Sequence, residues 1–217
     1  MKRCVMGLSR RAEHRFRHFG LLKILLSLRD THFLLPHSHQ RALKGLKARS
    51  RSMNWLDFVS LREIQVLKAL AIHPTIIRLY DAILSERGEY FLVFEYAPGG
   101  SLLAYIQSLK RSKEATGAHP EGPLVPESRI LSILRDTLRG LHHIHSNSFI
   151  HRDIKPDNLL LVDGVCKIAD FNLARPVSER DSTASRSRAT YVATRWYRAP
   201  EVLLQSPSYG CPIDIFA

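Results

Sequence analysis

The sequence predicts an α+β fold, on three observations. Apolar residues at three- or four-residue spacing indicate helices over 55–70 and 130–144, and short apolar runs indicate strands over 76–80 and 90–94. An Asp-Gly dipeptide between two further apolar runs indicates a β-hairpin around Asp163. The 217 residues are 45% hydrophobic, which is enough to form a globular core.

The first predicted helix carries a carboxylate on its apolar face. The residues that share this face are Trp55, Val59, Glu63, Leu67 and Leu70. Because a buried charge is costly unless it is paired, we expect Glu63 to have a cationic partner. Lys44 is the candidate and Lys47 is a nearby rival. In the alternative interpretation, Glu63 lies in water at the edge of the stripe and Lys44 is solvated.

The middle of the chain is predicted to pass through a surface loop into a long helix. Residues 110–126 are polar and rich in Pro and Gly, which is typical of a loop. The helix that follows has one apolar face, formed by Ile130, Leu131, Leu134, Leu138, Leu141 and Ile144. His142, His143 and His145 near its end raise the question of a metal site. We favour the other interpretation, because cationic residues commonly occupy the last turn of a helix.

The turn at Asp163-Gly164 sets the register of the predicted hairpin, because a two-residue turn of this type needs positive φ at both residues. The paired residues are Val162 with Val165, Leu160 with Lys167, and Asn158 with Ala169. Asn158 and Asp170 are therefore expected to emerge together at the open end of the hairpin.

The residues around this open end carry the groups that phosphate chemistry needs. Asn158 and Asp170 offer hard oxygen ligands, which suit Mg²⁺ held between a protein and phosphates. Asp153 is placed to accept a proton from an attacking hydroxyl, and Lys155 to offset the charge of a moving phosphoryl group. The alternative is an ordinary hairpin with polar ends, since Asp and Asn are common at strand ends.

Three segments carry a family resemblance. Residues 151–158 read His-Arg-Asp-Ile-Lys-Pro-Asp-Asn, and residues 170–172 read Asp-Phe-Asn. Together with residues 192–201, Val-Ala-Thr-Arg-Trp-Tyr-Arg-Ala-Pro-Glu, they resemble the eukaryotic-type serine/threonine protein kinases. The last segment is similar to the CMGC group, and most like its germ-cell-associated and meiosis-inducing (MAK/RCK-type) kinases. The resemblance covers about residues 41–217.

The resemblance implies a bilobal protein-kinase-like fold with a partial N-lobe over 41–97 and a partial C-lobe over 98–217. The implied activity is phosphoryl transfer from ATP, with Mg²⁺, to a hydroxyl of a protein substrate. In this activity Asp153 orients and deprotonates the acceptor, Lys155 steadies the transferred group, and Asn158 and Asp170 hold Mg²⁺.

Further site residues are implied by the resemblance alone. Lys44, in Arg41-Ala42-Leu43-Lys44, takes the place of the phosphate-binding lysine and is positioned by Glu63. The residues around adenine are Phe94 as gatekeeper, the backbone of Glu95 and Ala97, and Leu160 beneath the ring. A regulatory stack is implied for His151, Phe171, Leu67 and Leu79.

Regulation and specificity are also implied by the resemblance. Related kinases are phosphorylated on a Thr-x-Tyr pair; here Tyr191 matches its second member, Ala189 stands at the first position, and Thr190 lies between them. We expect an upstream kinase to act on Tyr191 or Thr190. Arg198 resembles the arginine associated with a preference for proline after the target residue.

The sequence departs from the family pattern in ways that favour weak or no activity of this chain, with a pseudokinase or protein-docking module as the alternative. No glycine-rich G-x-G-x-x-G motif precedes Lys44, and the chain ends at Ala217, where the αF helix is expected to begin. Asn172 replaces the glycine of the Asp-Phe-Gly motif. Because asparagine tolerates positive φ, we expect this change to slow rearrangement of the loop while metal binding is kept.

The basic charge lies at the N-terminus. The net charge is +12, and residues 1–52 hold thirteen Lys or Arg against Glu13 and Asp30. The remainder is nearly neutral, so nucleic-acid binding is not expected. Residues 1–40 are open to three interpretations: a mitochondrial presequence, a basic arm, or a foreign N-terminus from a misassembled gene model, which we favour.

The cysteines and the hydropathy pattern bear on location. Cys4, Cys166 and Cys211 show neither metal spacing nor an even framework, which is typical of a reducing compartment. No apolar stretch approaches the length of a membrane span. We therefore expect a cytoplasmic or nuclear protein that does not enter the membrane.

Overall fold

The structure is a computed structural model, and it describes residues 41–46, 57, 60–84, 89–116, 123–178, 196–204, 206 and 209–217. The chain divides into two compact units. The first unit comprises Met1–Phe58 and Leu79–Tyr96, and the second comprises Val59–Arg78 and Ala97–Ala217. No helix in the described ranges has both the length and the apolar character that crossing a membrane requires.

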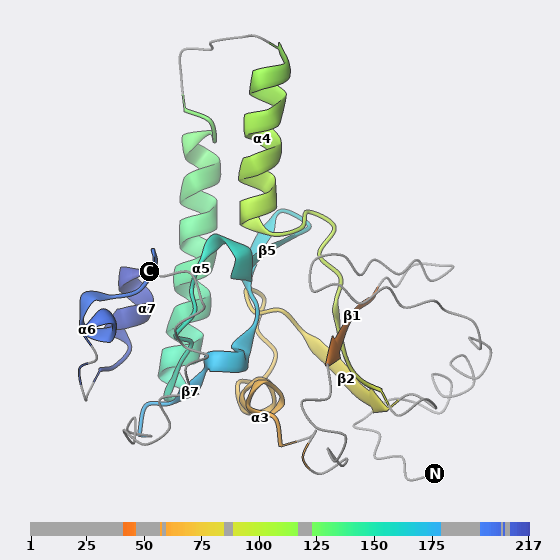
Figure 1. Cartoon of the computed structure of the whole chain (residues 1–217), viewed down its shortest axis with the longest axis vertical. Helices are drawn as coiled ribbons and strands as arrows, with labels where there is room; N and C mark the ends of the chain where they lie inside the picture. The colour runs from red at the N-terminus through yellow and green to blue at the C-terminus, as the bar shows by residue number, and fades with distance from the viewer. Residues whose placement is uncertain are drawn as a thin grey trace, which may run out of the picture. The chain divides into compact units, whose positions relative to one another are not determined.

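The described part of the first unit is a three-stranded antiparallel sheet (Figure 1). Its strands are β1 (Arg41–Leu46), β2 (Leu79–Leu84) and β3 (Tyr90–Glu95), in the order β1-β3-β2. The predicted strand over 90–94 is confirmed. All five of these residues are buried, as expected for a short continuous apolar run at the centre of a sheet.

The predicted strand over 76–80 is wrong in its bounds. Ile76 forms a parallel bridge to Ile168, and the N–H of Ile77 donates to the carbonyl of Ile168 at 2.9 Å. These residues belong to the second unit, and β2 begins only at Leu79. The apolar run over 76–80 thus pairs with β6 in its first half and with β3 in its second half. Hydrophobic periodicity does not show where the pairing strand changes.

Helix α3 (Arg62–Ala69) occupies the end of the predicted helix 55–70. Glu63 is only 2% exposed, so the interpretation that placed it in water is wrong. Leu70 is also buried, and Leu67 is partly buried against the core of the second unit. Trp55 and Val59 lie outside the described residues.

Helix α4 (Leu102–Thr116) replaces the first part of the predicted loop over 110–126. It begins after Ser101, whose Oγ accepts a hydrogen bond from the N–H of Ala104 at 3.2 Å, as an N-cap does. Residues 110–115 are Lys-Arg-Ser-Lys-Glu-Ala, and most of these residues favour helices. The loop prediction is therefore wrong for 110–116, because polar residues on an exposed helix give the same compositional signal as a loop.

Helix α5 (Glu127–Ser146) buries a different face from the predicted one. Leu141 and Ile144 are buried as expected, but the other predicted core residues are exposed, namely Ile130 (49%), Leu131 (57%), Leu134 (51%) and Leu138 (44%). The buried face instead contains Ile133, Asp136, Thr137 and Gly140.

Two contacts explain why this polar face of α5 is buried. The Asp136 carboxylate accepts a hydrogen bond from the N–H of Cys166 at 3.1 Å. At Gly140 an added Cβ would lie 2.8 Å from the side chain of Ile168 and 3.1 Å from the carbonyl of Thr75. The hydrogen bond to Asp136 and the close packing at Gly140 therefore decide which face of α5 is buried. Neither contact can be inferred from the hydrophobic periodicity.

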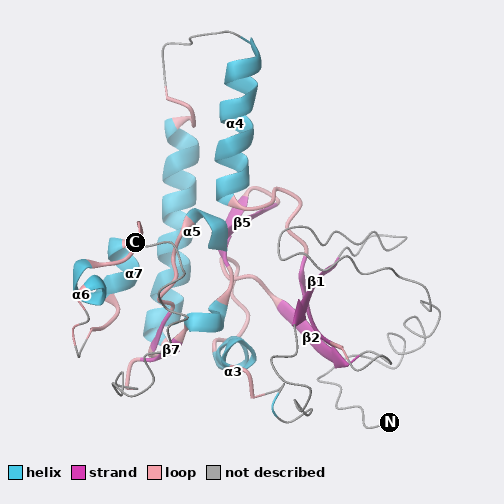
Figure 2. Ribbon diagram, viewed as in Figure 1, coloured by secondary structure: helices cyan, strands magenta, loops and turns pink. Residues whose placement is uncertain are grey.

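The rest of the second unit consists of short elements around α5, as Figure 2 shows in its colours. They are β4 (Phe149–Ile150), η1 (Pro156–Asn158), β5 (Leu159–Val162), β6 (Val165–Ile168), η2 (Phe171–Leu173), β7 (Arg175–Pro176), α6 (Pro200–Leu203) and α7 (Pro212–Phe216). Strand β4 pairs with β7, and β5 pairs with β6.

The core of the second unit lies where these elements meet. Val66 of α3, Ile144 of α5, Leu161 of β5, Ile168 of β6 and Phe171 of η2 belong to one buried cluster. A smaller cluster joins β4 with the segments around α6 and α7. The loop between β4 and η1 and the loop after β6 both extend from these packed clusters. Side chains on the two loops can therefore be held in fixed positions.

Candidate functional site

The hairpin has the predicted register. Val162 pairs with Val165 and Leu160 with Lys167, and the N–H of Ala169 donates to the carbonyl of Asn158 at 2.9 Å. The turn residues Asp163 and Gly164 have φ of 47° and 85°. The turn chemistry read from the dipeptide is confirmed, and it brings the residues after Ala169 level with those before Leu159.

The loop 153–158 brings two donor side chains to one carboxylate oxygen of Asp153. Lys155 Nζ donates to Asp153 Oδ2 at 2.7 Å, and Asn158 Nδ2 donates to the same oxygen at 2.8 Å. Both partners of the ion pair have side chains only 16% exposed. Two donors on Oδ2 orient the carboxylate, so that Oδ1 is the oxygen suited to accept a proton from a substrate.

The amide of Asn158 is oriented by the same contacts. Its Nδ2 also donates to the backbone carbonyl of Asp153 at 2.7 Å, so that both of its bonds go to one residue. This arrangement turns the amide oxygen to the opposite side. Asn158 is 7% exposed, and its position is therefore well restrained.

Asp170 has an unusual backbone conformation. Its φ and ψ are 64° and 71°, in the left-handed region, and η2 begins directly after it. Strain of this kind is typical of functional sites. Asn172 itself is not among the residues with positive φ, and the expected slowing of loop rearrangement stays a prediction. Its side chain instead donates from Nδ2 to Asp170 Oδ1 at 2.7 Å.

The imidazole of His151 lies among these acidic groups. The carboxylates of Asp214, Asp153 and Asp170 all act on it electrostatically. His151 is fully buried and meets the ring of Phe171 edge-on, with 4.8 Å between the ring centroids. Two members of the implied regulatory stack therefore touch. The place of Leu79, which belongs to the first unit, stays a prediction.

Asp214, for which the sequence pattern predicts no role, anchors the loop that carries Asp153. Its carboxylate accepts hydrogen bonds from the backbone N–H of His151 at 2.8 Å, from the N–H of Arg152 at 2.7 Å, and from His145 Nε2 at 2.9 Å. Arg152 has a φ of 72°, and these bonds hold that strained conformation. No local pattern signals the contact, because more than sixty residues separate the partners.

The hydrogen bonds of His151 define its neutral form. Nε2 donates to the carbonyl of Ala169 at 3.1 Å, and Nδ1 accepts from the N–H of Asp153 at 3.3 Å. Burial lowers the pKa of His151, against the opposing effects of Asp214, the bond to Ala169, Asp153 and Asp170. A protonated ring would have no lone pair for the Asp153 N–H.

A pH dependence of stability follows from this burial. The unfolded chain binds a proton at His151 below its ordinary pKa of about 6.5, whereas the folded chain does not. We expect the free energy of unfolding to be retained above pH 6.5 and to fall below it, by up to about 1.4 kcal/mol per pH unit from this residue. Urea denaturation between pH 5 and 8 measures the slope. The His151→Phe variant should show a smaller slope, and an unchanged slope would contradict this account.

The oxygen donors fit a hard divalent cation. The amide oxygen of Asn158 and the carboxylate of Asp170 are ligands of the type that Mg²⁺ takes together with substrate phosphates and water. Within the described ranges no group of three or more His, Cys, Asp or Glu side chains is arranged to bind a metal on its own. Water or the phosphates of a ligand would supply the rest of the coordination of such a cation.

Two of the three histidines at the end of α5 make contacts with other segments of the second unit. His143 stacks on His73, with 4.5 Å between the ring centroids, and its Nε2 contacts the carbonyl of Leu70. His145 binds Asp214. Burial, and then the neighbouring His143, lower the pKa of His73.

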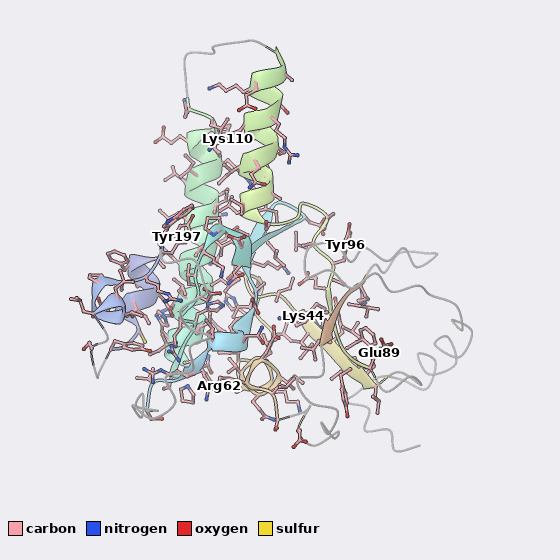
Figure 3. The ribbon with its side chains drawn as sticks, in the orientation of Figure 1. Lys44, Arg62, Glu89, Tyr96, Lys110 and Tyr197 are labelled. Atoms are coloured by element: carbon pink, nitrogen blue, oxygen red, sulfur yellow. The ribbon has the colours of Figure 1, made fainter. Side chains whose placement is uncertain are left out.

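The residues implied for nucleotide binding divide between the two units. Lys44 lies on β1, opposite Leu92 of β3, and is labelled in Figure 3. Glu95 is the last residue of β3 in the first unit. In the second unit, Glu63 lies on α3, Ala97 accepts a turn hydrogen bond from Gly100 at 3.0 Å, and Leu160 lies on β5. The Lys44–Glu63 pair and the adenine contacts stay predictions.

A small pocket of about 40 Å³ adjoins the proposed base. Asp153, Lys155, Tyr197 and Arg198 are among the residues that line it, and Tyr197 is labelled in Figure 3. The pocket thus brings together Asp153, the residue expected to accept a proton, and Arg198, which the family resemblance associates with substrate preference. Tyr191, Thr190 and Ala189 lie outside the described residues.

Comparisons with known proteins agree on one family. Residues 35–217 match the protein kinase domain family. The chain is 42% identical over 177 residues to a probable serine/threonine-protein kinase of Dictyostelium discoideum, covering 81% of this chain and 30% of that protein. It is 38% identical over 177 residues to the serine/threonine-protein kinase MAK of Mus musculus, covering 81% of this chain and 25% of that protein.

A solved structure shows the same fold. The CAK complex from Chaetomium thermophilum, bound to ATP-gamma-S, contains a chain that matches with a TM-score of 0.60 and 31% identity. The match covers 82% of this chain and 50% of that one. The chain therefore spans about half of the solved neighbour and less than a third of the curated relatives given above.

Proposed function

Because the chain belongs to the protein kinase family, we propose that it transfers the γ-phosphoryl group of ATP to a serine or threonine hydroxyl of a protein. The family resemblance predicted from residues 151–172 and 192–201 is confirmed, and so is the kinase fold. The observation that carries the proposed activity is the pair of donors, Lys155 and Asn158, on a single oxygen of Asp153.

The proposed reaction uses Asp153 as the proton acceptor. The substrate hydroxyl oxygen bonds to the γ-phosphorus, the bond to the bridging oxygen of ADP breaks, and the hydroxyl proton passes to Asp153 Oδ1. Lys155, which already contacts Asp153, offsets the negative charge of the transferred group. Positioning and electrostatics supply most of the catalysis in such reactions.

Mg²⁺ is the proposed cofactor, with the amide oxygen of Asn158 and the carboxylate of Asp170 as its protein ligands. When bound, the cation neutralises charge that develops on the β- and γ-phosphates. ATP binding is supported by the ATP-gamma-S named for the solved CAK neighbour. Lys44, Glu63, the backbone of Glu95 and Ala97, and Leu160 are the proposed nucleotide contacts.

Substrate preference and regulation are proposed from the residues near Asp153. Arg198 shares a pocket with this residue, which supports a preference for proline after the target hydroxyl. Activation by an upstream kinase at Tyr191 or Thr190 is proposed from the sequence resemblance alone.

A protein-docking module without catalysis is the second candidate function. Two observations favour it: the sequence has no glycine-rich phosphate motif before Lys44, and Asn172 occupies the glycine position of the metal-binding motif. Both interpretations keep the protein-binding surfaces. They differ in whether bound nucleotide is turned over.

A binding experiment tests the cofactor assignment. At a Mg-ATP concentration 100-fold above its Kd, the stability of the folded chain should rise by about 2.7 kcal/mol, visible as a higher melting temperature. The Asp170→Ala variant should lose most of this stabilisation. Asp163→Asn, which alters an exposed carboxylate at the far end of the hairpin, is the matched control and should keep it.

Transfer of radiolabel from ATP to a protein then separates the two candidate functions. Labelled protein product supports the kinase proposal. A chain that binds Mg-ATP but transfers no label is the docking module instead. A melting temperature that does not change on addition of Mg-ATP would contradict the proposed cofactor site.

A further inference from the structure

One side chain near the proposed metal site has no counterpart in the family motif. Asn172 follows Phe171 in η2, its side chain is exposed, and its Nδ2 lies 2.7 Å from Asp170 Oδ1. This distance is at the short end of the range for hydrogen bonds to a carboxylate, so the contact is charge-assisted. The glycine usual at this position has no side chain with which to make it.

The contact restrains a side chain that the backbone alone does not. Asp170 has left-handed φ and ψ and stands at the end of the hairpin, where the chain leaves β6 for η2. Its backbone is therefore set by the hairpin and η2, whereas the orientation of its carboxylate depends on the partners that hold χ1 and χ2. The amide of Asn172 is such a partner, and it fixes which oxygen faces η2.

Donors to a coordinating carboxylate influence the metal. Hydrogen bonds from outside the first coordination sphere orient the ligand atoms, and their loss typically costs 10–100-fold in metal affinity. An N–H donor also occupies one lone pair of Oδ1 and so restricts the orientations in which the carboxylate meets a cation. The Asn172 amide contacts Asp170 as a donor only, since Nδ2 is the atom that faces the carboxylate.

We propose that Asn172 is a positioning residue for the divalent cation: by donating to Asp170 Oδ1 it orients the carboxylate that binds the cation. This inference rests on the proposed function, because it takes Asp170 as a metal ligand. It changes the meaning of the substitution at this position. The replacement of glycine by Asn172 supports metal binding in this chain and does not impair it.

The opposite effect is physically conceivable and gives the inference its test. If the N–H of Asn172 competes with the cation for Oδ1, removing the side chain tightens metal binding. If it positions the carboxylate, removing the side chain weakens metal binding. The sign of the change therefore decides between the two.

The experiment titrates the whole 217-residue chain with Mn²⁺ alone and follows the electron paramagnetic resonance signal of the free ion. The variants are Asn172→Gly, which removes the donor, and Asn172→Ser, which keeps a hydroxyl donor. Asp170→Ala removes the ligand, and Asp163→Asn is the control for a distant carboxylate. Circular dichroism spectra verify that each variant is folded.

We expect Asn172→Gly to weaken the Asp170-dependent Mn²⁺ binding by about 10–100-fold. Asn172→Ser should recover part of this loss, which a purely structural role would not predict. Asp163→Asn should match the unaltered chain.

Two results overturn the inference, and they are distinguishable. Unchanged or tighter Mn²⁺ binding by Asn172→Gly, with binding lost in Asp170→Ala, refutes the positioning role and leaves the proposed function intact. Unchanged binding by Asp170→Ala shows that Asp170 is not a ligand, which refutes the cofactor assignment itself.

Discussion

Replacing Asp153 by asparagine is expected to lower the rate of phosphoryl transfer by about 10²–10⁴-fold, the usual contribution of a general base. The variant keeps the size of the side chain and an oxygen that can bond to Lys155 or Asn158. It removes the negative charge that accepts the hydroxyl proton. The effect should therefore appear in the rate of transfer, measured with radiolabelled ATP under single-turnover conditions, and only weakly in nucleotide binding.

The neighbouring Asp157 provides a matched control for this variant. It lies in the same loop but is exposed, and no contact of its side chain enters the proposed mechanism. Asp157→Asn should transfer phosphate at close to the rate of the unaltered chain. A rate for Asp153→Asn within about twofold of the unaltered chain would show that another group accepts the proton.

The second large effect concerns stability. Asp214→Ala is expected to lower the free energy of unfolding by about 3–5 kcal/mol, the range typical of removing one partner from a buried charged contact. Asp214 is 3% exposed, and its loss leaves two backbone N–H groups and His145 without their acceptor. Urea denaturation measures the change.

The same variant should disturb the site as well as the fold. The left-handed conformation of Arg152 persists because Asp214 holds the backbone N–H groups of His151 and of Arg152 itself. Without the anchor, we expect Asp153 to lose its fixed position as the loop relaxes. Asp163→Asn, at an exposed carboxylate, should change the free energy of unfolding by less than about 0.5 kcal/mol. A loss below about 1 kcal/mol for Asp214→Ala would contradict the anchoring role.

Much of the proposed site is local and can be read from the chain. The register of the hairpin follows from the Asp163-Gly164 turn, because a two-residue turn with positive φ at both positions leaves only one pairing for the strands. Asp153 and Asn158 are five residues apart, so their hydrogen bond closes within a single loop. Interactions over such short spans are governed by turn geometry, which depends on few residues.

The buried face of helix α5 could not be predicted from the spacing of apolar residues. Its leucine stripe over 130–138 is the stronger hydrophobic signal, but the face that packs is the one with Asp136 and Gly140. The choice between two faces of one helix depends on what the neighbouring strand offers. Here β6 offers an N–H for the Asp136 carboxylate, together with close packing at Gly140.

The contacts that hold the site rigid belong to the tertiary structure. Asp214 reaches the loop at His151 and Arg152 across more than sixty residues, and no spacing rule connects residues so far apart. Asn172 is close to Asp170 in the chain, yet its role as a donor appears only once η2 turns its amide back toward the carboxylate. The amino-acid order thus specifies which chemical groups are present and how adjacent ones pair. The packing of distant segments decides which of those groups are buried, charged and held still, because burial and long-range hydrogen bonds depend on the whole chain.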